Sequence, residues 1–163
     1  MGFKEAVGAT RNLEGRWQAG LGALRGEDKA HIKPEDTSTK RLRGGVDIDN
    51  ALLASDPNGN RWDFAIGYQH ANRTDEFIYW VEVHTGSDSQ ISVVLKKMTW
   101  LQAWLGGDGK ELAKFDRSFV WAPSGATSFT KGATQVKTLA DHGLIYAGSV
   151  FKIPTNHATA KAR

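Results

Sequence analysis

The chain has 163 residues, 40% hydrophobic and 24% charged, with a formal net charge of +3, as expected for one soluble globular domain. Because it contains no cysteine, a disulfide scaffold, a thiolate zinc site and a cysteine nucleophile are excluded, and a reducing cytoplasmic location is expected. No apolar run is long enough for a membrane span or a signal-peptide core, so no membrane partner is expected, and the mild basic charge permits nucleic-acid binding without demanding it.

Apolar residues at helical spacing predict a first helix over residues 3–25, although its glycines lower helix propensity. Residues 25–43 are polar and lack periodicity, so they are predicted to form a long exposed connection. Lys40, Arg41 and Arg43 end this connection as a basic cluster. The cluster is either a solvated loop surface or a patch that faces phosphate.

A short strand over residues 44–48 and a short helix over residues 50–54 follow. Asp49 stands at the expected N-cap of that helix, where a carboxylate accepts a hydrogen bond from a free helical N–H. Asp47, on the strand, has no such local structural explanation. It is therefore kept as a candidate for chemistry.

The stretch over residues 61–105 reads as strand, turn, strand, loop and helix. An antiparallel hairpin sets the start of one strand beside the end of the next. Asp63, at the start of the first strand, should therefore approach Glu82 and His84, at the end of the second strand. A one-residue slip in register would separate them, and the polar connection over residues 70–76 leaves that register open.

The rest of the chain alternates helix and strand. Apolar residues at helical spacing predict a helix over residues 89–105, followed by a strand over residues 118–122. Thr127 or Ser128 is expected to cap a further helix. Residues 144–153 predict one or two strand segments, and residues 154–163 a disordered basic tail.

The predicted order is α-β-β-β-α-β-α-β, which indicates an α/β (α+β) fold with a mixed central sheet flanked by helices. One domain over residues 1–153 accounts for all of these elements.

Carboxylates gathered at a strand edge suggest metal chemistry, because a buried ionised carboxylate is costly unless it is paired or binds a metal. Mg²⁺ takes oxygen ligands, and it can activate a water and neutralise charge on a phosphodiester. Asp63, Glu82 and Asp47 are the predicted metal ligands. His84 would hold or deprotonate the attacking water, or bind the metal through nitrogen and favour Mn²⁺.

A strand that starts with Asp63, a strand that ends in Glu82-Val83-His84, and the helix, strand and helix after them resemble the PD-(D/E)XK nuclease superfamily. The likeness covers about residues 3–153. It implies a restriction-endonuclease-like fold that cuts DNA or RNA with Mg²⁺, and a homodimer, since many such nucleases act as dimers.

Within this resemblance, Asp63 matches the first acid of the family and Glu82 the acid of its Glu-x-Lys element. Glu14 or Asp47 matches the additional acid of some members. The family lysine is absent, because His84 stands in its place and a neutral imidazole offers less positive charge.

Lys96 or Lys97, on the following helix, would replace the missing lysine, as happens in some members of the superfamily. Lys97 lies nearer the apolar stripe, so its ammonium is expected to reach the sheet. The predicted catalytic residues are therefore Asp63, Glu82, His84 and Lys97.

The leading hypothesis is a metal-dependent nuclease-like protein, a hydrolase acting on DNA or RNA. One alternative is a catalytically inactive protein of the same fold that binds a protein or a nucleic acid, with Asp63 and Glu82 paired to Arg or Lys. Another is an accessory protein on an unrelated α/β fold, with both acids facing water.

Overall fold

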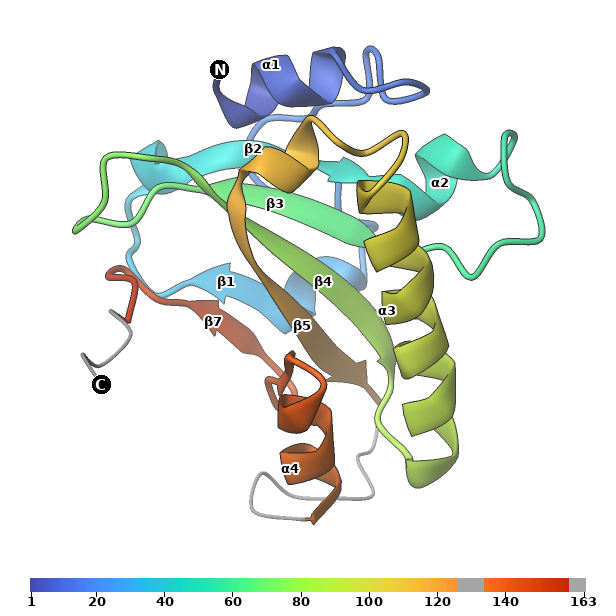
Figure 1. Ribbon diagram of the computed structural model, residues 1–163. Coiled ribbons are helices and arrows are strands. Elements are labelled where there is room, and N and C mark those ends of the chain that lie inside the picture. Colours follow the sequence, from blue (N-terminus) through green and yellow to red (C-terminus); the bar gives the residue numbers. More distant parts are fainter. Residues whose placement is uncertain (126–133, 159–163) are drawn as a thin grey trace.

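The computed structural model describes residues 1–125 and 134–158. A mixed five-stranded sheet in the order β2-β3-β4-β5-β6 forms its centre (Figure 1). The strands are β2 (Leu42–Asp47), β3 (Phe64–Tyr68), β4 (Phe77–Thr85), β5 (Asp116–Ser124) and β6 (Leu144–Tyr146). The pairs β2–β3 and β3–β4 are antiparallel, whereas β4–β5 and β5–β6 are parallel. The predicted mixed sheet with flanking helices is confirmed.

Within residues 1–125 and 134–158, four α-helices and four short 3-10 turns flank the sheet. The helices are α1 (Phe3–Gly8), α2 (Ile48–Leu52), α3 (Ile91–Leu105) and α4 (Thr134–Asp141). The 3-10 turns are η1 (Asp28–His31), η2 (Thr39–Arg41), η3 (Asp88–Gln90) and η4 (Leu112–Lys114). Figure 1 shows α3 running along β4. No helix in the described part of the chain is long and apolar enough to cross a membrane.

Each face of the sheet buries its own apolar core. Ala65, Ile78 and Trp80 point to the face covered by α1 and α3. The alternate residues of β3 and β4 pack on the opposite face, where the short pair β1 (Ile32–Pro34) and β7 (Phe151–Ile153) covers them. Because both faces are covered, β3 and most of β4 are apolar throughout.

The first predicted helix is wrong beyond Gly8, where α1 ends. Asn12, Gly15 and Gly20 have positive φ angles of 69°, 74° and 58°, which a right-handed helix does not allow. Leu13 is nevertheless fully buried. The apolar spacing in this segment therefore reflected burial rather than helix.

The predicted N-cap is also wrong. The N-cap of α2 is Asp47, whose Oδ1 accepts a hydrogen bond from the backbone N–H of Asn50 at 2.9 Å. Asp49 lies inside the helix and accepts from Nε of Arg61 at 3.0 Å. Because α2 begins at Ile48, two residues earlier than predicted, Asp47 is its N-cap and has the structural explanation that the sequence had not offered.

The connection over residues 25–43 is mostly exposed, as expected, but it also contains β1. Ile32 of β1 pairs with Phe151 of β7 and is fully buried, although a three-residue strand is too short to show a periodicity. Of the later predictions, Thr127, Ser128 and residues 159–163 of the expected tail lie outside the described residues.

Gly67 of β3 is the position where α1 meets the sheet, because an added Cβ would overlap the ring of Phe3. We predict that Gly67→Ala lowers the free energy of unfolding by about 1–3 kcal/mol, the usual cost of overpacking a core. Gly8→Ala is the matched control, since a Cβ there meets nothing within 4 Å. Urea unfolding of both variants tests this, and equal stability would contradict the tight contact.

Candidate functional site

Asp63 and Glu82 are joined by reciprocal hydrogen bonds at one edge of the sheet. The pairing of Phe64 with Val81 sets Asp63 beside Glu82. The backbone N–H of Asp63 donates to Oε2 of Glu82 at 3.0 Å, and the backbone N–H of Val83 donates to Oδ2 of Asp63 at 3.0 Å. Glu82 is 0% exposed and Asp63 is 7% exposed. The register that the sequence left open therefore brings both acids together on the α3 face.

Lys97 supplies the cation that both carboxylates share. It lies on α3 between the buried residues Val94 and Met98, so its side chain extends toward the sheet edge. Its Nζ contacts Oε1 of Glu82 and lies 3.8 Å from Oδ1 of Asp63. Lys96 is exposed, so Lys97 is the lysine that reaches the acids.

Arg25 is a second cation at the site. No sequence pattern pointed to it, because it lies in a polar connection without periodicity. Its guanidinium lies 3.2 Å from Asp63, 3.4 Å from Asp28, 3.6 Å from Asp49 and 3.8 Å from Asp47. The guanidinium thus separates Asp47 from the Asp63–Glu82 pair.

His84 lies beside the acids and is 28% exposed. Its Nδ1 is 3.9 Å from Oε1 of Glu82, and its Nε2 is 2.6 Å from Oε1 of Gln90. The carbonyl of His84 accepts a hydrogen bond from Nε1 of Trp121 at 3.0 Å, which fixes the end of β4. Gln90 precedes α3 and was not anticipated, because a glutamine in a polar loop carries no pattern of its own.

The two carboxyl groups compete for too little positive charge. Burial raises the pKa of Glu82 to about 8, and the neighbouring charge of Asp63 adds to this effect, whereas Lys97 opposes it. Burial also raises the pKa of Asp63 above its ordinary value, against the opposing charges of Lys97 and Arg25. An additional cation at this edge would therefore relieve an unfavourable interaction.

The acids border an open cavity of about 480 Å³. Its charged or titratable lining consists of Arg25, Glu27, Asp28, Asp63, Glu82, His84 and Lys97. Carboxylates outnumber cations in this lining, so a polyanion would enter it only with a compensating positive charge. Asp47 does not line the cavity.

The donor set fits a hard divalent ion that keeps several waters. Within the described ranges, no group of three or more His, Asp or Glu residues is arranged to hold a metal alone. Mg²⁺ is commonly bound by one or two carboxylates together with waters and substrate phosphate. Asp63 and Glu82 supply two such carboxylates, both converging on the ammonium of Lys97.

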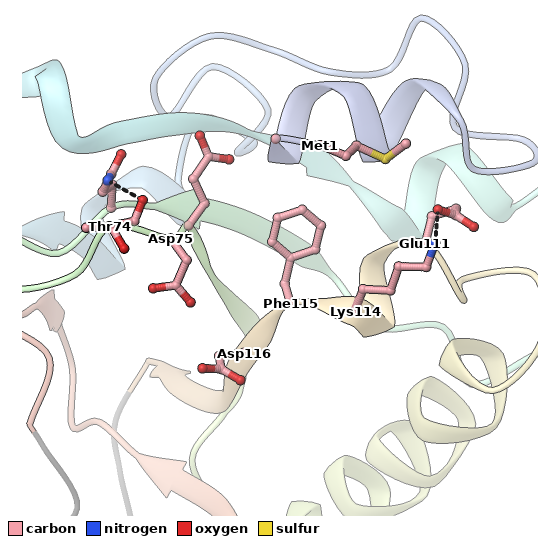
Figure 2. Close-up of a pocket in the computed structure, with 10 residues that line it drawn as sticks. Met1, Thr74, Asp75, Glu111, Lys114, Phe115 and Asp116 are labelled. Carbon is pink, nitrogen blue, oxygen red and sulfur yellow. Dashed lines mark hydrogen bonds and ion pairs between the residues drawn. The ribbon is translucent and has the colours of Figure 1, made fainter.

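A separate cavity of about 550 Å³ lies between the N-terminus, the β3–β4 connection and the start of β5 (Figure 2). Its lining is mainly acidic, and Lys114 there is paired with Glu111 at 2.7 Å. None of the predicted catalytic residues lines it.

No family model, curated protein or solved structure matches this chain. The functional argument therefore depends on the chemistry of the residues gathered around Asp63 and Glu82.

We predict that Lys97→Met lowers the free energy of unfolding by about 1–2 kcal/mol at pH 9, above the pKa of Glu82, because it leaves the buried carboxylate of Glu82 without its cation. Lys96→Met is the matched control on the same helix, and it should change stability by no more than about 0.5 kcal/mol. Chemical denaturation of the two variants provides the measurement. Equal stability would show that Lys97 does not support the fold.

The raised pKa of Glu82 predicts how the free energy of unfolding changes with pH. Because the folded-state pKa of about 8 exceeds the ordinary value of 4.5, the contribution of this group to stability is complete below pH 4.5 and falls as the pH rises through 8. Glu82→Gln stays neutral, so the stability of the wild type relative to this variant should fall between pH 5 and pH 8. Urea unfolding at several pH values measures that difference, and a constant difference would refute the raised pKa.

Proposed function

We propose that this chain is a metal-dependent nuclease-like protein that hydrolyses phosphodiester bonds in DNA or RNA. The observation that carries the proposal is the convergence of two buried carboxylates, Asp63 and Glu82, on one cation at the edge of an open cavity. The mixed sheet and the order of its elements agree with the restriction-endonuclease-like fold that the sequence resemblance implies.

Oδ1 of Asp63 and Oε1 of Glu82 would hold Mg²⁺ or Mn²⁺, since these two oxygens already face a shared cation. When bound, the metal would supply a more acidic water and stabilise negative charge on the phosphate. Asp47 is not included in the proposed ligand set. Its Oδ1 caps α2, and its side chain does not line the cavity.

Lys97 would bind the scissile phosphate and stabilise the negative charge that develops on it. Its ammonium enters the site from α3, as in those members of the superfamily in which the lysine comes from the following helix. The Nζ of Lys97 lies between Glu82 and Asp63, so a metal that took these two oxygens would release the ammonium to a phosphate at the same edge.

His84 would accept the proton of the attacking water through Nδ1. Its Nε2 lies 2.6 Å from the amide oxygen of Gln90, an acceptor, so a neutral imidazole carries its proton on Nε2. The lone pair of Nδ1 is then free on the side of Glu82, 3.9 Å from Oε1. This tautomer suits a general base at the proposed metal site.

A second candidate function is phosphate or nucleic-acid binding without cleavage on the same fold. It is favoured by the ion pairs of the site, because Lys97 and Arg25 already partly neutralise Glu82 and Asp63. In this case the two cations would contact the partner, and no divalent ion would be required.

We expect Mg²⁺ and Mn²⁺ to raise the melting temperature of the wild type and to support cleavage of labelled single- or double-stranded DNA or RNA. Asp63→Asn/Glu82→Gln should abolish metal binding and reduce cleavage by about 100-fold or more, because both ligands and the associated charge stabilisation are lost. Calorimetry and gel assays with each substrate provide the measurements.

Asp108→Asn/Asp141→Asn is the matched control, since it removes two exposed acids away from the cavity. Metal binding and cleavage should be unchanged in this variant. Nucleic-acid binding without metal binding or cleavage in the wild type would favour the second candidate. If the wild type binds no metal, even in the presence of a nucleic acid, and also binds no nucleic acid, both candidate functions are contradicted.

A further inference from the structure

A third charged cavity, of about 430 Å³, lies at the end of β3 remote from Asp63. It is formed where residues 38–43 approach residues 69–73. Its charged lining is entirely cationic and consists of Lys40, Arg41, Arg43 and Arg73. This lining gathers the basic cluster seen in the sequence and adds Arg73 from the β3–β4 connection.

The acids that pair with these arginines lie outside the cavity. Nε of Arg41 is 3.0 Å from Asp36, and Nε of Arg43 is 3.2 Å from Glu76. Arg73 is held by Asp75 and Asp116.

Glu76 lines the neighbouring acidic cavity instead. Asp75 and Asp116 line it as well (Figure 2). Gln69 borders both cavities and accepts a hydrogen bond from Arg43. The acids and Gln69 between the two cavities therefore hold the arginines from the side of the acidic cavity. The other cavity keeps a cationic lining.

Two cationic side chains of this lining have hydrogen-bond donors that are available to a ligand. Lys40 is exposed and its ammonium has no ion pair within the part of the chain that the structure describes. Among the residues that the structure describes, Arg41 is engaged only through Nε, by Asp36, so its two terminal nitrogens are available to a ligand. A guanidinium with a free pair of N–H groups is well suited to two oxygens of one anion.

His70 provides an independent sign of a missing ligand. It lines the same cavity, yet it is 0% exposed, and its Nδ1 is a buried polar atom without a hydrogen-bond partner among the described residues. Its Nε2 lies 2.7 Å from the hydroxyl of Tyr79. When that hydroxyl donates to Nε2, Nδ1 carries the proton and becomes an unsatisfied donor, which is costly in a buried position.

We propose that this cavity binds a phosphate group, held by Lys40, Arg41 and the Nδ1–H of His70. A phosphate offers several oxygens to donors that approach from different directions, and its charge matches the cationic lining. The group can belong to a nucleic-acid backbone or to a free phosphate compound. The proposal does not depend on the function proposed for the Asp63–Glu82 site.

The test is a titration of the wild type, in EDTA, with inorganic phosphate, a nucleoside monophosphate and a short single-stranded oligonucleotide. The imidazole NMR signals of His70 and calorimetry report binding. We expect at least one of the three probes to shift the His70 signals. Lys40→Gln/Arg41→Gln should weaken that binding about tenfold or more, because charge-assisted hydrogen bonds are lost.

Lys29→Gln/Lys33→Gln is the control, since it removes two exposed lysines that do not line the cavity, and it should leave affinity within about twofold. The single variant Lys40→Gln, at an exposed side chain, tests the same point if the double variant is unstable. Binding of the oligonucleotide identifies a backbone phosphate, and binding of the small probes alone identifies a free phosphate compound. Unshifted His70 signals with all three probes, or equal affinity in the cavity variants and the control, would overturn the proposal.

Discussion

The burial of the Glu82 carboxylate is the constraint on which the rest of the site depends. A carboxylate with no exposure is tolerated only when hydrogen bonds and a counter-charge replace its hydration. The backbone N–H of Asp63 and the ammonium of Lys97 provide them, from β3 and from α3. The hairpin register and the seating of α3 must therefore both be correct before Glu82 can be ionised inside the protein.

This requirement couples the site to the architecture. β4 pairs antiparallel with β3 on one side and parallel with β5 on the other, which places it near the centre of the sheet. The crossover from β4 to its parallel neighbour β5 contains α3, and such a helix packs on one face of the sheet. Lys97 can reach Glu82 because that crossover lies on the face to which Glu82 points.

The sequence predicted the parts of the fold and site that depend on alternation and periodicity. The two-residue period of β3 and β4 allowed Asp63 and Glu82 to share a face in one of the possible registers, and the apolar stripe of α3 indicated Lys97 rather than Lys96. Arg25 could not be found in this way. Its position depends on the irregular segment that follows α1, which has a positive φ angle at Asn12, and not on any periodic pattern.

Arg25 was missed by the sequence analysis, whereas Asp47 was included as a candidate ligand and has a structural role instead. On sequence it resembled a ligand because no local partner was evident, yet its carboxylate caps α2. A shift in the start of a short helix was enough to exchange the roles of Asp47 and Asp49. Patterns of acids therefore indicated the edge of the sheet at which the carboxylates gather, while hydrogen bonds to the backbone distinguished the acid that caps α2 from the acids that border the cavity.

The ammonium of Lys97 bears on the choice between the two candidate functions. It lies at the point where Asp63 and Glu82 converge, so a divalent ion would have to share or take that position. If the ammonium of Lys97 alone neutralised both carboxylates, the pKa of Glu82 would lie near its ordinary value. Burial and the charge of Asp63 instead raise it to about 8. A divalent ion carries twice the charge to the same two oxygens. It would free Lys97 for a phosphate, which is the physical reason to prefer the proposed metal-dependent function over binding alone.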